Sequence, residues 1–240
     1  MPFRFQRLCE GETNRSSVMV FKDRRDAGEK LARALEKYSD QNALVLAIPR
    51  GGVEVGYQVA KHLNATLSIL VSRKLPFPDE PEAGFGAVAE DGSTFIFQGT
   101  AHWLSKKTVD KIIEQQKEEI QRRIVVLRKG APLPEITDKV VILVDDGLAM
   151  GSTMRAAINL CKNKKAQKII VAVPVSGEEV AKEVGELAHE IVVLSKPAFF
   201  RAVAQAYANW YDVSDEEVIE TMEKWQREHK KEERRWTQER

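Results

Sequence analysis

Short apolar runs alternate with amphipathic stretches along most of the chain. Runs of four to six apolar or β-branched residues, each ended by polar or turn-forming residues, predict five strands at residues 43–48, 66–71, 140–144, 168–173 and 190–194. Helical spacing follows the first strand and separates the later ones, at residues 152–163 and 177–187. Parallel strands need crossovers that cover both faces of a sheet, so this alternation predicts an α/β fold with a mostly parallel sheet and helices on both faces.

Further helices are expected outside this alternation. Residues 21–38 place apolar side chains at helical spacing, with Asp23 as a candidate N-cap and Asp26 three residues later. Residues 105–128 carry an apolar stripe along one face and acidic and basic residues suited to i,i+4 pairs. Residues 214–240 predict a charged helix whose two tryptophans, Trp225 and Trp236, share one face, which suggests a solvated helix with an apolar contact stripe.

Residues 75–97 interrupt the regular pattern. The segment begins with three prolines within seven residues and ends in two apolar runs that flank Glu90-Asp-Gly-Ser. This composition predicts a mobile loop that leads into a β-hairpin. Because long insertions in compact domains usually serve a function, we expect a functional role for it.

Composition and charge exclude several classes of protein. The 240 residues are 43% hydrophobic and 30% charged, with 37 basic and 36 acidic side chains, as in an ordinary globular protein without a basic surface for nucleic acid. Cys9 and Cys161 are far apart and lack metal-ligand spacing, so neither a disulfide framework nor a zinc site is expected. No apolar run is long enough to span a membrane or form a signal peptide, and a cytoplasmic location without a membrane partner is the expectation.

The segment 140–157 combines a buried strand, two adjacent carboxylates, a Gly/Ser/Thr loop and the start of a helix. The loop and the helix N-terminus present unpaired backbone N–H groups, which together with the hydroxyls of Ser152 and Thr153 can bind a phosphate. Asp145 and Asp146 can accept hydrogen bonds from vicinal hydroxyls. Each of these residues alone is also explained by an ordinary turn, but their combination indicates a ribose 5-phosphate.

Two other phosphate motifs do not fit this segment. A P-loop requires GxxxxGK[ST], whereas Gly147 and Gly151 are four residues apart and no lysine precedes Ser152. The dinucleotide fingerprint GxGxxG is also missing, because Gly84-Phe-Gly86 has no third glycine three residues further on. The motif therefore differs from those of P-loop hydrolases and dinucleotide-dependent enzymes.

The strand, acidic pair and loop resemble the 5-phosphoribosyl-1-pyrophosphate motif of type I phosphoribosyltransferases. Further segments, at residues 21–32, 48–56, 73–75, 82–89, 119–123 and 199–218, resemble the predicted phosphoribosyltransferases known mainly from bacterial and archaeal genomes. The resemblance covers residues 18–222. It implies three parts: an extension at 1–20, the phosphoribosyltransferase domain at 21–213 with its hood loop at 75–97, and the charged helix at 214–240.

The resemblance assigns roles by position. Asp145 and Asp146 would bind the ribose 2- and 3-hydroxyls, and the 5-phosphate would lie in the loop formed by Gly147, Leu148, Ala149, Met150, Gly151, Ser152 and Thr153. Residues 49–52, with Arg50, Gly51 and Gly52, match the pyrophosphate loop of the class. Arg73 and Lys74, expected at the end of the second strand, match the basic pair that neutralises the diphosphate, and they complete the candidate catalytic set with Asp145 and Asp146.

The position of these residues also has a physical basis. Ligands of open α/β sheets bind beyond the carboxyl ends of the strands, next to the point where strand order reverses. A strand order of 2-1-3-4-5 would place the loops after the first and third strands side by side. Arg50, Arg73 and Lys74 would then add positive charge where a diphosphate with Mg²⁺ leaves. Asp145 and Asp146 would contact the metal indirectly, through ribose hydroxyls or water.

The acceptor is less well defined by the sequence. Comparison with the class points to residues 174–176 and 196–200, where Phe199 or Phe200 could stack on a ring, although packing into the core is the stronger expectation for each phenylalanine. The resemblance implies transfer to a nitrogenous heterocycle, as in nucleotide salvage, by a protein that binds small molecules rather than nucleic acid, and it leaves a homodimer open.

Met150 departs from the class pattern, which has threonine there. Loss of one neutral donor costs about 0.5–1.5 kcal/mol, enough to weaken phosphate binding without abolishing it. Two hypotheses therefore remain: an enzyme that transfers phosphoribosyl groups, and a phosphoribosylpyrophosphate-binding sensor that has lost turnover.

Overall fold

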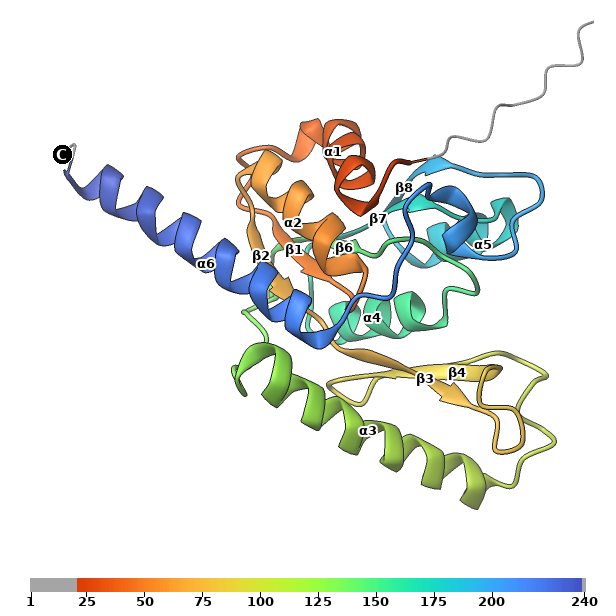
Figure 1. Ribbon diagram of the computed structural model, residues 1–240. Coiled ribbons are helices and arrows are strands. Elements are labelled where there is room, and N and C mark those ends of the chain that lie inside the picture. Colours follow the sequence, from red (N-terminus) through yellow and green to blue (C-terminus); the bar gives the residue numbers. More distant parts are fainter. Residues whose placement is uncertain (1–20, 239–240) are drawn as a thin grey trace, which may run out of the picture.

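A parallel sheet of five strands forms the centre of the protein. The computed structural model describes residues 21–238 (Figure 1). The strands lie in the order β2-β1-β6-β7-β8, and every neighbouring pair is parallel. Their bounds are β1 (Leu44–Ala47), β2 (Thr66–Ile69), β6 (Val140–Val144), β7 (Lys168–Val175) and β8 (Glu190–Ser195). The α/β fold class and the 2-1-3-4-5 order expected from the sequence are confirmed.

Helices cover both faces of this sheet. One apolar layer joins the sheet to α1 (Arg24–Ala34) and α2 (Gly52–Leu63), and the other joins it to α4 (Ser152–Asn163) and α5 (Glu178–Leu187) (Figure 1). Because successive side chains of a strand point to opposite faces, the apolar residues of β6 divide between the two layers. Burial on both faces explains why these strands consist of continuous apolar runs in the sequence.

Local capping fixes where the helices begin. The side chain of Asp23 accepts a hydrogen bond of 2.8 Å from the backbone N–H of Asp26, as the sequence predicted for the start of α1. A 3-10 turn, η1 (Glu36–Tyr38), follows α1, and a second one, η2 (Val203–Ala206), lies after β8. Ser105 caps the long helix α3 (Lys106–Arg128) by accepting from Thr108 N–H at 3.1 Å. These caps satisfy backbone donors that a helix leaves unpaired at its N-terminus.

The insertion between β2 and β6 forms a second, antiparallel sheet. Its strands are β3 (Ser72–Pro76), β4 (Gly84–Ala89) and β5 (Thr94–Ile96), and α3 packs against them (Figure 1). The hairpin expected around Glu90-Asp-Gly-Ser is present as β4 and β5. The second strand of the core ends at Ile69 rather than at residue 71, so Arg73 and Lys74 lie within β3 and not at the end of that strand, which corrects the expectation. Residues 72–76 form a separate strand, β3, because they pair with β4.

The charged C-terminal segment is helical, as expected, and its first turns pack on the core. α6 spans Asp215–Gln238. The ring of Trp225 lies edge-on to Tyr57 with 5.9 Å between centroids, and the Tyr57 hydroxyl donates to Glu228 at 2.6 Å. Trp225 thus forms the expected apolar contact, whereas Trp236 lies outside the residues whose side chains are described. Among residues 21–238 no helix is long and apolar enough to cross a membrane.

A buried ion pair joins the insertion to the core. The guanidinium of Arg128, at the end of α3, donates to both carboxylate oxygens of Glu90 and, at 2.8 Å, to the carbonyl of Ile69. Glu90 also accepts from the Val71 backbone N–H at 3.0 Å. The Arg128 and Glu90 side chains are only 6% and 7% exposed, and burial raises the pKa of the Glu90 carboxyl despite the arginine. The pair therefore ties the end of α3 and the turn after β4 to the chain that leaves β2.

Removal of Arg128 should therefore be costly. Arg128→Met leaves the buried Glu90 without its counter-charge, for which we expect a loss of about 3–5 kcal/mol in the free energy of unfolding, measured by urea denaturation. Lys129→Met, which removes the neighbouring exposed cation and its pair with Glu223, should cost less than about 1 kcal/mol. Equal losses for the two variants would contradict this role of the buried pair.

Candidate functional site

The loops after β1 and β6 lie side by side at one edge of the central sheet. Ala47 and Val144 are register partners at the ends of these strands, and the backbone N–H of Ile48 donates to the Val144 carbonyl at 2.8 Å. After β1 the chain forms the glycine loop, residues 49–52, and after β6 it reaches the acidic pair, Asp145 and Asp146. The structure thus brings together two of the predicted segments, residues 49–52 and 145–153, at the point where strand order reverses.

Two glycines allow this loop to approach the acidic pair. A Cβ atom on Gly51 would lie 1.9 Å from Oδ2 of Asp146, and one on Gly52 would lie 2.9 Å from the Cα of Asp145. The peptide bond between Pro49 and Arg50 is cis. Any larger residue at Gly51 would collide with a carboxylate, so the glycines are required by close packing rather than only by a turn.

The acidic pair is largely buried and already partly hydrogen-bonded. Oδ1 of Asp145 accepts from the backbone N–H of Asp146 at 2.8 Å, and Oδ2 of Asp146 accepts from Arg24 Nε at 2.9 Å. Burial raises the pKa of Asp145 well above its usual range, and the charge of Asp146 raises it further. Burial also raises the pKa of Asp146, against the opposing effect of Arg24. Among residues 21–238, these two hydrogen bonds use one oxygen of each carboxylate, Oδ1 of Asp145 and Oδ2 of Asp146.

Arg24 was not among the residues selected from the sequence. Its side chain is 3% exposed, its NH1 group donates to the Tyr211 carbonyl at 2.9 Å, and its guanidinium lies 4.1 Å from the ring centre of Trp210. Tyr207 adds a hydrogen bond of 2.7 Å from its hydroxyl to the carbonyl of Asp146. The segment after β8 and helix α1 therefore hold the acidic pair in place.

A signal for Arg24 did exist in the sequence. Arg24 lies three, seven and eleven residues before Ala27, Leu31 and Leu35, so it shares the buried face of the predicted helix. A charged residue on an apolar face needs a buried partner. No comparable signal identifies Tyr207 or Trp210, because their contacts depend on how the segment after β8 folds back.

The predicted phosphate loop runs from Gly147 to Thr153. Leu148 is buried and donates its backbone N–H to the Val175 carbonyl at 2.9 Å, whereas the side chain of Met150 is 54% exposed. Gly151 adopts φ +71°, a left-handed conformation suited to glycine, and it is the N-cap of α4. The first backbone N–H groups of α4 have no acceptor within the helix and carry its positive dipole, so this loop can accommodate an anion.

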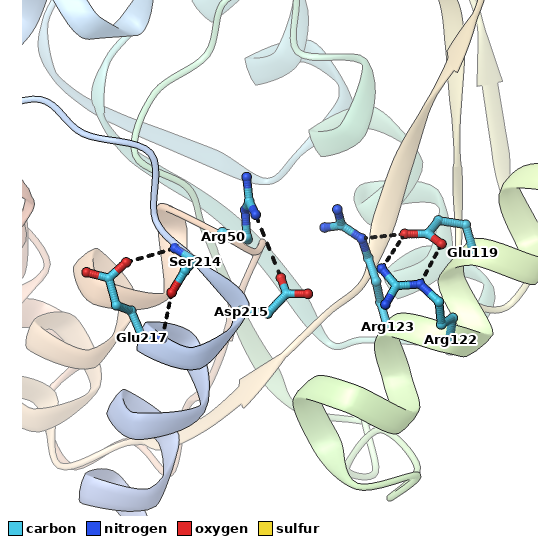
Figure 2. Close-up of polar contacts among 7 residues, drawn as sticks. All are labelled: Arg50, Glu119, Arg122, Arg123, Ser214, Asp215 and Glu217. Atoms are coloured by element: carbon cyan, nitrogen blue, oxygen red, sulfur yellow. Dashed lines mark hydrogen bonds and ion pairs between the residues drawn. The ribbon is translucent and has the colours of Figure 1, made fainter.

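The basic residues occupy different faces around this edge. Nε of Arg73 donates to Gln116 on α3 at 3.1 Å, whereas the ammonium of Lys74, on the opposite face of β3, donates to the carbonyl of Glu82. Arg50 extends from the glycine loop, with NH1 3.9 Å from Asp215 at the start of α6 (Figure 2). Arg50 is close enough to Arg73 to lower its pKa slightly, while Lys74 is turned towards the β3–β4 connection.

The predicted acceptor segments are only partly accessible. The side chains of residues 174–176 are buried. Phe199 is 93% exposed, so the expectation that it packs into the core is wrong, whereas Phe200 is half-buried against the cluster that contains Phe21 and Val175. Adjacent side chains therefore differ here: Phe200 packs against this cluster, whereas Phe199 is exposed to solvent.

The carboxylates at this edge suit indirect contacts to a metal. Within residues 21–238 no three or more histidine, cysteine or acidic residues converge as a metal cluster. Each of Asp145 and Asp146 has one oxygen outside the hydrogen bonds described above. Such oxygens can accept from ribose hydroxyls or from the waters that Mg²⁺ retains.

Comparisons with known proteins place the chain in a family. The model of the phosphoribosyl transferase domain matches residues 21–208. The "Putative phosphoribosyl transferase Rv0571c" of Mycobacterium tuberculosis H37Rv is 39% identical over 206 residues, covering 84% of this chain and 46% of the relative; its counterpart MT0597 in strain CDC 1551 matches equally well. The chain therefore spans about half the length of the curated relatives it matches.

A solved structure with a similar fold is that of TT1426 from Thermus thermophilus. It is 33% identical, with a TM-score of 0.74, and the match covers 86% of this chain and 99% of that chain. With the family model matching most of the chain, the α/β protein described above belongs to the phosphoribosyl transferase domain family.

The contact between Arg24 and Asp146 predicts a pH-dependent loss of stability. Arg24→Gln should raise the pKa of Asp146 further above its unfolded value, and a carboxyl with a raised pKa destabilises the fold as pH rises through that window. We expect a loss of about 3 kcal/mol in the free energy of unfolding at pH 8 and a smaller loss at pH 5, where Asp146 is closer to neutral.

Arg25→Gln is the matched control for this prediction. Arg25 is the next residue on α1, its side chain is 70% exposed, and it pairs with Glu29, so its replacement should change stability little at either pH. Denaturation curves for both variants at the two pH values test the prediction. A deficit for Arg24→Gln that is the same at pH 5 and pH 8 would show that the charge of Asp146 is not involved.

Proposed function

We propose that this protein binds 5-phosphoribosyl-1-pyrophosphate and transfers the phosphoribosyl group to a nitrogenous acceptor, with release of pyrophosphate. The observation that carries the proposal is the juxtaposition of the glycine loop, residues 49–52, with the acidic pair and the phosphate loop at one sheet edge. Membership of the phosphoribosyl transferase domain family supports it. A nucleobase-like heterocycle, as in nucleotide salvage in the cytoplasm, is the proposed acceptor.

The roles of the residues follow from their chemistry. Asp145 and Asp146 accept hydrogen bonds from the ribose hydroxyls, and their charge favours the positive character that the ribose ring gains when the bond to the diphosphate breaks. The loop from Gly147 to Thr153 holds the 5-phosphate on backbone N–H groups. Mg²⁺ bound to the substrate would help to neutralise the diphosphate.

The leaving group and the acceptor complete the reaction. The bond from the anomeric carbon to the diphosphate oxygen breaks, and its electron pair leaves with pyrophosphate. The acceptor nitrogen forms the new bond to that carbon, and its proton passes to solvent. Arg50 and Arg73 stabilise the departing charge, and the glycine loop supplies backbone N–H groups close to the ribose site. The second sheet with α3 is the segment that would cover the site and exclude water.

Calorimetry with Mg²⁺ and phosphoribosylpyrophosphate tests the binding step. Asp145→Asn should weaken binding at least about tenfold, because hydrogen bonds to charged groups contribute about 1.5–3 kcal/mol. The fold should tolerate the change, since burial makes the Asp145 charge unfavourable in the free protein and Arg24 keeps its partner. Asp138→Asn, the same change at an exposed carboxyl, should leave affinity unchanged. Absence of binding by the native protein would refute the proposal.

Measurements of turnover distinguish an enzyme from a sensor that binds phosphoribosylpyrophosphate without reacting. Met150 supports it, because the exposed thioether supplies no hydroxyl donor at the phosphate loop. Release of pyrophosphate with a purine, pyrimidine or related heterocycle in a substrate panel would establish an enzyme. Tight binding of phosphoribosylpyrophosphate without release for any acceptor would instead favour the sensor.

A further inference from the structure

Arginines from three elements converge between the glycine loop and α3. Arg50 extends from the loop after β1, Arg73 from β3, and Arg122 and Arg123 from α3. Figure 2 shows the guanidinium of Arg123 on the side of α3 that faces Arg50 and Asp215. The hydrogen bond from Arg73 to Gln116 holds β3 against the same helix. Segments far apart in the sequence therefore direct positive charge into one region.

Arg123 occupies an unusual position for an arginine. Its neighbours at helical spacing are Gln116, which bonds Arg73, and the buried Ile120 and Leu127. Arg123 therefore lies on the inner face of α3 and is 16% exposed, whereas the adjacent Arg122 is 55% exposed. Long cationic side chains normally extend their heads into water, so the inward direction of Arg123 needs an explanation.

Local carboxylates only partly satisfy Arg123. Glu119 accepts from Nε of Arg123 at 3.2 Å, but the same carboxylate accepts two shorter bonds of 2.8 Å from Arg122 (Figure 2). Its pKa is lowered to about 2, first of all by the bond from Arg122. Within residues 21–238 no hydrogen bond uses the terminal nitrogens of Arg123. These donors are available to a ligand.

Positive charge in this region exceeds the negative charge that faces it. Burial lowers the pKa of Arg73, and the nearby charge of Arg123 lowers it further. The charge of Glu119 acts in the opposite direction, and Arg122 and Arg50 add smaller effects that again lower this pKa. Asp215, whose Oδ1 is buried and without a hydrogen bond among the described residues, is 3.9 Å from Arg50. A multivalent anion would stabilise these neighbouring guanidinium groups against their mutual repulsion. The planar pair of donors of an arginine suits the oxygens of a phosphate.

We propose that Arg123 of α3 binds the diphosphate of phosphoribosylpyrophosphate together with Arg50 and Arg73, so that the insertion contributes a cation to the leaving-group site. This inference rests on the proposed function and extends it to a helix outside the core. It explains why Arg123 faces inward, and it gives α3 a direct part in binding. Arg122 holds Glu119 and thereby leaves the terminal nitrogens of Arg123 free for the anion.

Two ligands that differ only in the diphosphate provide the test. Calorimetry is performed with phosphoribosylpyrophosphate and with ribose 5-phosphate, both in the presence of Mg²⁺, on the native chain, Arg123→Gln and Lys117→Gln. Arg123→Gln should weaken binding of phosphoribosylpyrophosphate about tenfold or more and change the affinity for ribose 5-phosphate less than about twofold, because only the former presents a diphosphate. Lys117→Gln removes the same charge from a more exposed side chain of α3, which pairs with Glu114, and it should change both affinities less than about threefold.

Each other outcome decides a separate question. Retained affinity of Arg123→Gln for phosphoribosylpyrophosphate, or an equal loss in Lys117→Gln, overturns the role of Arg123. A parallel loss for ribose 5-phosphate shows a structural effect and overturns it too. If the native chain binds neither ligand, the proposed function itself fails. Arg123→Lys should recover only part of the affinity, since lysine keeps the charge but lacks the planar pair of donors.

Discussion

The parallel pairing of β1 with β6 is the constraint on which the site depends. These strands are far apart in the sequence, and their register sets Ala47 against Val144, so the loops that follow them must share one edge of the sheet. The space between the loops is so small that a single added carbon at Gly51 would overlap Asp146. Backbone N–H groups of one loop and carboxylates of the other are therefore brought together by the sheet rather than by contacts between their own side chains.

A second layer of contacts holds this edge against electrostatic repulsion. Two adjacent carboxylates in a buried position disfavour their own ionisation, and the positive charge of Arg24 opposes this effect. Arg24 is itself held by the carbonyl of Tyr211 and the ring of Trp210. The segment after β8 is thus part of the structure that sustains the charge of the acidic pair, although none of its residues lies in the predicted motif.

The fold could be predicted from sequence because its signals are local. Continuous apolar runs reveal the buried parallel strands, and Asp23 marks the start of α1 through its own capping bond. The position of Arg73 and Lys74 was missed because β3 forms only by pairing with β4, a non-local contact that converts an expected strand end into a strand. Phe199 was expected in the core from its residue type alone, whereas in the structure it is exposed and its neighbour Phe200 packs against apolar residues.

The difference between local and non-local signals also applies to the candidate site, where it separates the acidic pair and its loop from the basic residues. The acidic pair and the predicted phosphate loop form one continuous segment, so they can be predicted from residue types alone, without the fold. The basic residues come from β3, α3 and the loop after β1, and an arginine in a sequence does not reveal which way its side chain points. The sequence of α3 does place Arg123 in line with Ile120 and Leu127, but only contact with β3 shows that this face meets Arg73. The proposed recognition of a diphosphate at this edge therefore requires the insertion to be packed as observed, which would link the second sheet to the chemistry of the first.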